Sequence, residues 1–187
     1  MNHASALLAP SAPPVPAGPA SAPAEPAQYL TFQLAHEMFA IGILAIKEII
    51  EYGHLTVVPM MPASVRGVIN LRGAVVPVID LQARFGERVS EVGKRTCIVI
   101  VEVGAPQERQ VVGVIVDAVN EVIDIAPSEI EAPPAFGARV RTDFIQGIGK
   151  VRGRFVILLD LDRTLAPDEL AALGHLQPEA APASGGH

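Results

Sequence analysis

An internal repeat constrains the fold of this chain more than any other feature of its sequence. Residues 67–85 (GVINLRGAVVPVIDLQARF) align without a gap with residues 147–165 (GIGKVRGRFVILLDLDRTL), at an offset of 80. Upstream, residues 41–50 (IGILAIKEII) align with residues 114–123 (VIVDAVNEVI) at an offset of 73. Chance similarity between Val/Ile-rich strands is the alternative, but both copies keep the order Glu, Arg-Gly, Asp-Leu. The repeat therefore predicts two concatenated units of five strands each.

Each copy of the repeat predicts a strand, a tight turn, a second strand and the start of a helix. The Arg-Gly pair supplies the turn, because glycine adopts a positive φ at little steric cost. Asp80 and Asp160 stand where a carboxylate can accept the free N–H groups of a following helix, so we interpret them as helix caps rather than as paired catalytic acids. Pro77 lacks a backbone N–H, which predicts that its strand lies at a sheet edge or in a bulge.

The apolar residues of the central region mostly follow the two-residue period of β-strands. Residues 29–34 alternate in this way and predict an entering strand. The runs 97–101, 111–116 and 155–159 are almost continuously Val, Ile and Leu, which is typical of strands buried on both faces. Half of the chain is hydrophobic, so these strands can enclose a substantial core without disulfides or metal ions.

Helical signals are few and short. They cover residues 43–49, a turn after Asp80, a turn near 127–130 and a segment at 167–173 that begins with proline and two acidic residues. The predicted fold is therefore mainly β, with two pseudo-repeated, five-stranded, SH3-like β-barrels packed around a shared hydrophobic core and a few short helices.

The two ends of the chain differ in composition from its centre. Residues 1–27 contain 9 Ala, 7 Pro and no Lys or Arg, which predicts a disordered, extended tail. Residues 174–187 hold little that could pack and are predicted to form a second flexible tail. Between the tails we place a first barrel at about 28–90, a second barrel at about 94–165 and a short helix at about 167–173.

Charge, histidine spacing and cysteine content exclude several functional classes. The net charge of −6 has the wrong sign for binding a phosphate backbone, so nucleic acid is not an expected partner. The five His residues do not approach metal-ligand spacing, and the chain has no nucleophile elbow or phosphate loop, so we expect no metal, cofactor or catalytic site. The single Cys97 and the lack of a signal-peptide core or membrane span predict a cytoplasmic protein.

Four sequence blocks, in this order and spacing, resemble the CheW-type chemotaxis coupling proteins. They are QYLTFQLAHEMFAIGILAIKEII, VRGVINLRGAVVPVIDLQARFG, VVGVIVDAVNEVIDI and FIQGIGKVRGRFVILLDLD, and they span about residues 28–165. The resemblance implies a non-enzymatic adaptor that links methyl-accepting chemoreceptors to the histidine kinase CheA in receptor arrays at the membrane. The alternative is a coupler of a non-flagellar chemosensory pathway that controls surface motility, development or second-messenger output.

The resemblance also implies a receptor-binding groove between the two barrels, into which a receptor helix would fit. Its residues would be Ile43, Ile46, Glu48, Arg72, Gly113, Val119 and Val122. The apolar members could instead only fill the core. Glu48 and Arg72 are implied to form an exposed ion pair, and the repeat predicts a second pair between Glu121 and Arg152.

A second surface, for the kinase regulatory domain, is implied at the barrel ends. Leu55, Thr56 and Val75 would make one contact, and the loop that carries Phe136 would make the other. Phe136 lies between prolines and a glycine and could anchor an interface, although a simple loop plug is the alternative.

Overall fold

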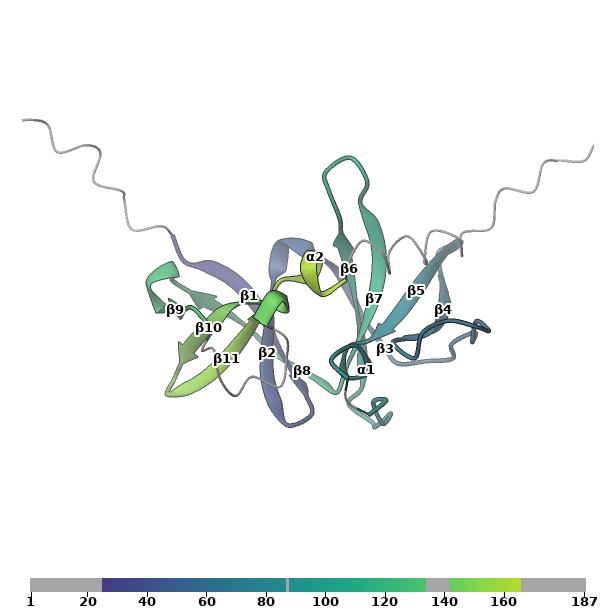
Figure 1. Cartoon of the computed structure of the whole chain (residues 1–187), viewed down its shortest axis with the longest axis horizontal. Helices are drawn as coiled ribbons and strands as arrows, with labels where there is room; N and C mark the ends of the chain where they lie inside the picture. Colours follow the sequence, from purple (N-terminus) through teal and green to yellow (C-terminus); the bar gives the residue numbers. More distant parts are fainter. Residues whose placement is uncertain (1–24, 87, 134–141, 166–187) are drawn as a thin grey trace, which may run out of the picture.

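The computed structural model describes residues 25–86, 88–133 and 142–165, and strands are their main secondary structure (Figure 1). The strands are β1 (Ala27–Leu34), β2 (Glu37–Gly42), β3 (Ile46–Glu51), β4 (Val65–Leu71), β5 (Ala74–Asp80), β6 (Cys97–Val103), β7 (Gln110–Val116), β8 (Ala118–Ile125), β9 (Ile130–Glu131), β10 (Ile145–Val151) and β11 (Arg154–Leu159). The helices are the 3-10 turns η1 (Ile43–Ala45), η2 (Pro127–Glu129) and η3 (Thr142–Phe144) and the α-helices α1 (Leu81–Arg84) and α2 (Leu161–Thr164). The mainly β fold is confirmed.

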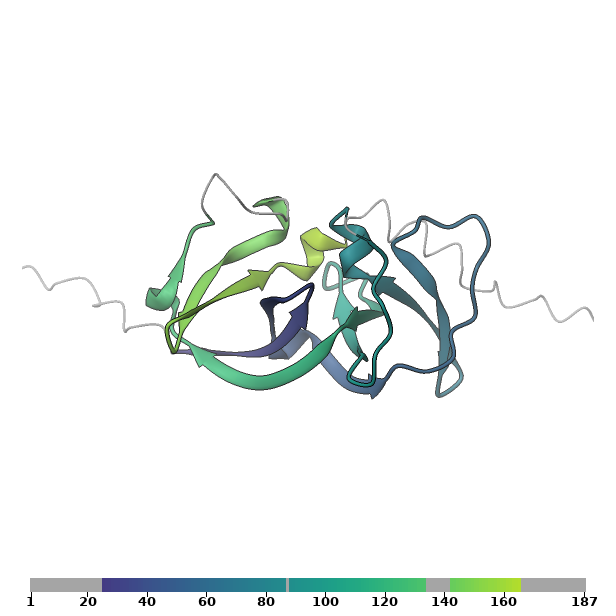
Figure 2. The same cartoon turned by 90° about the horizontal axis from the view of Figure 1, so that it is seen from below.

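The strands form two sheets that curve into open barrels at opposite ends of the molecule (Figures 1 and 2). Sheet A has the order β8-β1-β2-β11-β10-β9, and sheet B has the order β3-β6-β7-β5-β4. Each sheet therefore takes two strands from one repeat unit and the rest from the other. The chain crosses between the sheets after β2 and crosses back after β7.

This exchange contradicts the expected division into a first barrel at 28–90 and a second at 94–165. Strands β1 and β2 belong to the barrel of the second unit, and β6 and β7 belong to the barrel of the first. Periodicity in the sequence shows that a segment forms a strand, but it does not show which strand it pairs with. The boundary of the amino-terminal tail also shifts slightly, because Ala27 is already part of β1.

The repeat predicted at an offset of 80 has the same backbone in both copies. Arg72 and Arg152 have φ angles of 52° and 50°, and the following Gly73 and Gly153 have φ angles of 86° and 77°. Positive φ at both central residues of a two-residue loop matches the hairpin turn whose twist fits that of the flanking strands. The predicted Arg-Gly turns are therefore confirmed in both hairpins.

Gly67 and Gly147 show why each copy begins with glycine. Both lie at a shift in strand register, in β4 and β10, respectively. A Cβ at Gly67 would collide with the carbonyl oxygen of Thr56, and a Cβ at Gly147 would lie 2.9 Å from the carbonyl oxygen of Glu131. In each barrel the backbone of another segment thus lies so close to the strand that a side chain at the glycine position would collide with it.

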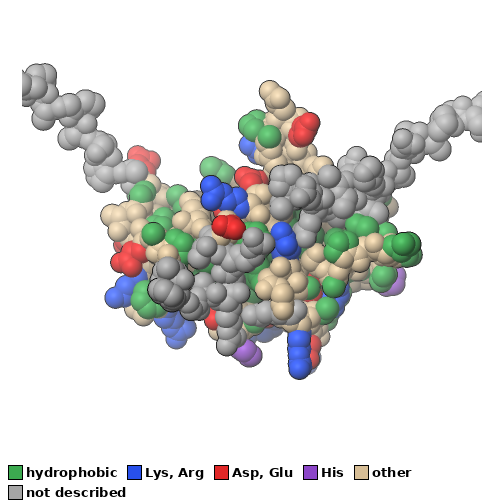
Figure 3. Space-filling view, in the orientation of Figure 1, with side chains coloured by type: hydrophobic (Ala, Val, Ile, Leu, Met, Phe, Trp, Pro, Cys, Tyr) green, Lys and Arg blue, Asp and Glu red, His purple; other side chains and the backbone are tan. Residues whose placement is uncertain are grey.

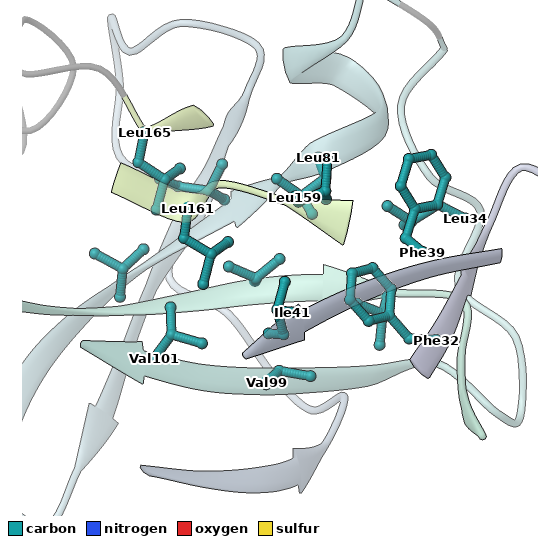
Figure 4. Close-up of a cluster of buried hydrophobic side chains, with 14 of the residues drawn as sticks. Phe32, Leu34, Phe39, Ile41, Leu81, Val99, Val101, Leu159, Leu161 and Leu165 are labelled. Carbon is teal, nitrogen blue, oxygen red and sulfur yellow. The ribbon is translucent and has the colours of Figure 1, made fainter. Parts of the chain in front are cut away.

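The hydrophobic core has three parts. One cluster, shown in Figure 4, joins the two sheets. Of the other two clusters, one fills the barrel of sheet A and one fills the barrel of sheet B. In β6, the side chains of Val99 and Val101 enter the shared cluster, whereas those of Ile98 and Ile100 point into the barrel of sheet B. Alternation between two buried faces explains the nearly continuous apolar runs and confirms the shared core.

The short helices agree only partly with the sequence prediction. The turns after Asp80 and near 127–130 are present as α1 and η2. The helix expected at 43–49 is wrong beyond its first turn, because η1 ends at Ala45 and β3 begins at Ile46. Burial alternates along this segment, with Glu48 half-buried and Ile49 exposed, as in an edge strand that pairs with β6 on one side. The helix expected at 167–173 lies outside the described residues.

Pro77 lies in the part of β5 that pairs with β4 alone. Pairing of β5 with β7 starts only at Val78, so the missing N–H of Pro77 interrupts no ladder on that side. The edge position predicted for Pro77 is therefore correct locally, although β5 as a whole is an inner strand. In the described ranges, no helix is long and apolar enough to cross a bilayer.

Candidate functional site

The predicted ion pair between Glu48 and Arg72 is present. Arg72 Nη2 donates a hydrogen bond of 2.8 Å to Glu48 Oε2, and the turn conformation of Arg72 directs its chain back toward β3. The Arg72 side chain is 79% exposed, whereas that of Glu48 is only 24% exposed. The other carboxylate oxygen of Glu48, Oε1, is buried and has no hydrogen-bond partner in the described chain. A polar group in this position can still accept a hydrogen bond from a docked partner.

The second pair that the repeat predicts is also present. Arg152 Nη1 lies 3.3 Å from Glu121 Oε1, and both residues are the repeat counterparts of the first pair. It is the looser of the two, because the distance is longer and the Glu121 side chain is 52% exposed. Each carboxylate comes from the first strand after a crossing between the sheets, β3 or β8, and both arginines come from hairpin turns.

The apolar residues of the predicted groove occupy two environments. Ile46 and Val119 are repeat counterparts and both pack, half-buried, against the shared core between the sheets. Val122 is exposed, as is its repeat counterpart Ile49, which the sequence analysis did not single out. Ile43 is half-buried in η1, beside Leu44, whose side chain is almost completely exposed. The structure thus places apolar side chains on both sides of the barrel junction.

The placement of Gly113 differs from the prediction. It is buried in β7, and a Cβ there would lie 2.7 Å from Ile98 and 3.3 Å from Val78, inside the barrel of sheet B. Gly113 therefore does not line an exposed groove. Its lack of a side chain makes room for neighbouring core residues, which is the core-filling alternative for this position.

Three of the residues predicted for the kinase contact, Leu55, Thr56 and Val75, lie at the outer end of sheet B. Thr56 pairs with Val68 and so covers part of edge strand β4, and Leu55 packs against the interior of the same barrel. Val75, in β5, is 39% exposed. Phe136 lies outside the described residues.

Sequence reasoning also missed exposed hydrophobic side chains at the barrel ends, among them Val57, Met60 and Phe155. Val57 and Met60 lie in the segment that follows Thr56. Phe155, on β11, is 67% exposed and is the repeat counterpart of Val75. The repeat offset of 80 residues, applied to Val75, would have identified Phe155. In Figure 3, hydrophobic atoms gather at the end of the molecule that β4 and β5 form.

The two repeated aspartates cap helices, as predicted. Asp80 Oδ1 accepts hydrogen bonds from the backbone N–H groups of Gln82 and Ala83. Asp160 Oδ1 accepts one from the backbone N–H of Arg163. The described residues include no group of His, Cys, Asp or Glu side chains placed to hold a metal ion. The described residues thus form two open barrels that carry exposed apolar side chains and exposed ion pairs.

Comparison with known proteins agrees with this architecture. Residues 28–169 match the CheW-like domain family. The chemotaxis protein CheW of Klebsiella aerogenes is 31% identical over 149 residues, covering 80% of this chain and 87% of that protein. CheW of Rhizobium meliloti is 32% identical over 145 residues, with coverages of 78% and 91%.

A solved structure extends the agreement to three dimensions. The scaffolding protein TtCheW from Thermoanaerobacter tengcongensis superposes with a TM-score of 0.68 at 35% identity, covering 77% of this chain and 90% of that one. Both the strand arrangement and the sequence therefore agree over nearly the whole described region. This chain belongs to the CheW-like domain family.

Proposed function

We propose that this chain is a non-enzymatic adaptor that couples methyl-accepting chemoreceptors to a CheA-type histidine kinase in a receptor array. The observation that carries the proposal is the Glu48–Arg72 pair beside the apolar junction of the two barrels, in a chain of the CheW-like family. The relatives named above are chemotaxis proteins, and the structural neighbour is a scaffolding protein.

The receptor would bind at the barrel junction. Ile46 and Val119 offer half-buried apolar surface there, which suits the apolar face of a docked helix. Glu48 would orient Arg72 and leave its buried Oε1 as an acceptor for a donor on the receptor. Because an exposed ion pair adds little stability, its main contribution would be to the shape and charge of the docking surface.

The kinase regulatory domain would bind at the outer end of sheet B. Thr56 and Val75 lie there with the exposed side chains of Val57 and Met60, so this end presents apolar surface that the fold leaves uncovered. Contacts of this kind are modest individually, and an array strengthens them by raising the effective concentration. Array association would bring the adaptor to the membrane through protein contacts alone.

The receptor contact is tested by charge exchange. Full-length chain, vesicle-bound receptor signalling fragments and kinase are mixed, and co-sedimentation of the chain is measured. Arg72→Glu places two carboxylates together and should lower receptor affinity about tenfold, whereas the double exchange Glu48→Arg/Arg72→Glu should recover part of the loss. Lys94→Glu makes the same charge change at another exposed residue and should have little effect. Equal losses for Arg72→Glu and Lys94→Glu would contradict the receptor assignment.

The kinase contact is tested by Val75→Asp in the same mixture. A carboxylate in an apolar interface should reduce kinase capture while receptor co-sedimentation is retained. The control is Val92→Asp, since Val92 is similarly exposed but distant in sequence from the predicted surface. Kinase capture that is unchanged by Val75→Asp would argue against this end of sheet B as the contact.

A further inference from the structure

The tip of the β10–β11 hairpin has a charge opposite to that of the whole chain. Lys150, Arg152 and Arg154 are all exposed there, and residues 144–159 contain no Asp or Glu. The chain as a whole carries a net charge of −6. Figure 3 shows Lys and Arg side chains gathered at the lower left, where Figure 1 places this hairpin tip. A local cationic cluster on an acidic protein is a surface that attracts acidic groups.

Two of these cations are available to a partner. Arg152 already pairs with Glu121, whereas Lys150 and Arg154 form no ion pair within the described chain. The equivalent positions in the β4–β5 hairpin are Asn70 and Ala74. Asn70 serves the turn itself, because its Oδ1 accepts a hydrogen bond from the backbone N–H of Gly73. A lysine cannot accept such a bond, so Lys150 has no corresponding structural role.

An exposed aromatic ring lies beside one of the free cations, Lys150, whereas Arg154 precedes the ring in β11 and projects from the opposite face of the hairpin tip. Phe155 pairs directly with Lys150 across the hairpin, so their side chains share one face of the sheet. Phe155 is 67% exposed. Aromatic and basic side chains in close proximity form the usual energetic centre of a protein interface.

We propose that the tip of the β10–β11 hairpin is a docking surface for an acidic segment of a partner protein, with an apolar side chain of that segment packed on Phe155. Of the predicted receptor and kinase residues that the structure describes, none lies in β10 or β11. A membrane surface is a poorer match, because stable adsorption to anionic lipid takes a cluster of about four to eight basic residues, and the hairpin offers two free ones.

The test is a titration of the ¹⁵N-labelled full-length chain with a synthetic twelve-residue peptide that contains four Glu and two Leu residues. Saturable shifts are expected at residues 145–159, and the affinity should fall as salt is added. Lys150→Gln/Arg154→Gln should weaken binding about tenfold, and Phe155→Ser should weaken it about fivefold. Glu121→Gln releases Arg152 and should strengthen binding about twofold. These exposed positions are not needed for folding, which the spectrum of each variant verifies.

Three controls distinguish specific docking from general charge attraction. The variant Lys94→Gln/Arg95→Gln removes two exposed cations elsewhere and should leave binding unchanged. A peptide with Gln in place of Glu should not bind, and vesicles of phosphatidylcholine and phosphatidylglycerol should bind more weakly than the acidic peptide. No saturable binding, an equal loss in the Lys94/Arg95 variant, or stronger binding to vesicles would overturn the proposal. These readouts need neither receptor nor kinase, so they do not depend on the proposed function.

Discussion

The two halves of this protein share a backbone but differ in how they use one repeated aspartate. Asp80 is fully buried, and besides its helix cap it accepts hydrogen bonds from Arg66 at 2.9 Å and from both the hydroxyl and the backbone N–H of Ser90. Asp160 keeps the cap but is partly exposed, and Gln146 stands where the first half has Arg66. The same local motif is therefore a buried interaction centre in one barrel, whereas in the other it is a partly exposed cap with one ion pair to Arg163.

The hairpin tips near the barrel junction show a similar contrast. In one hairpin, the backbone N–H of Ala35 donates to Asp117, which also accepts from the Gln82 amide. In the other, the backbone N–H of Gly104 donates to Asp162 at 2.9 Å. The carboxylate comes from the β7–β8 connection in the first case and from α2 in the second. Each of these two connections is therefore held by a hydrogen bond to a carboxylate, but non-equivalent residues supply that carboxylate.

The largest expected difference between the halves concerns Asp80 and Asp160. Asp80→Ala leaves Arg66 without its buried partner and should lower the free energy of unfolding by about 3–5 kcal/mol. Asp160→Ala removes a partly exposed cap and an ion pair of 3.6 Å with Arg163, and it should cost about 1 kcal/mol. Urea denaturation of both variants, followed by circular dichroism, measures the two values.

Asp80→Asn refines this comparison if the alanine variant does not fold. The amide keeps an acceptor for the cap but loses the charge that Arg66 requires, so an intermediate loss is expected. Similar losses for Asp80→Ala and Asp160→Ala would show that the buried interactions of Asp80 add nothing to the cap.

A smaller difference is expected for the two glycines at the start of the repeat. Gly67→Ala places a Cβ against the backbone of Thr56 and should destabilise the fold by about 3 kcal/mol. In Gly147→Ala the nearest atom is a methyl group of Ile130, which can move aside, and the backbone oxygen of Glu131 is less close, at 2.9 Å, so a smaller loss of about 2 kcal/mol is expected. Thermal unfolding of both variants tests the ranking, and a larger loss for Gly147→Ala would reverse it.

The smallest effect on stability is expected for the two ion pairs. Arg72→Ala and Arg152→Ala each remove a mostly exposed guanidinium and should change the unfolding free energy by less than about 1 kcal/mol. The loss should be the larger for Arg72, because Glu48 is the more buried carboxylate. Chemical denaturation at low and at high salt measures the loss for each variant. A loss well above about 1 kcal/mol for Arg152→Ala would mean that the Glu121–Arg152 pair stabilises the fold.

Much of the fold could be predicted because its signals are local. The apolar runs, the Arg-Gly turns and the aspartate caps depend on neighbouring residues, and the structure confirms each of them. The pair of Glu121 and Arg152 followed from the repeat, since equivalent backbones bring equivalent side chains together. Phe155 was missed, although the same reasoning from Val75 would have identified it.

Other features depended on contacts that are distant in the sequence. The segment after Ala45 was predicted as helix, but pairing with β6 makes it a strand. Gly113 was assigned to a groove, but the alternation of β7 turns it into the barrel interior. Both errors come from judging a residue by its neighbours in the chain. The segment after Ala45 pairs with a strand more than 40 residues away, and the surroundings of Gly113 are side chains of two other strands.

The sequence by itself determined that the chain is built from two copies of one β unit, with apolar strands, tight turns and capped helix starts at fixed positions. Only the tertiary structure decided that the copies exchange strands, so that each barrel contains parts of both and the core between them is shared. The physical reason is that hydrophobic periodicity defines the faces of a strand, whereas backbone hydrogen bonds are the same for any partner. The choice among partners is made by the packing of the whole core.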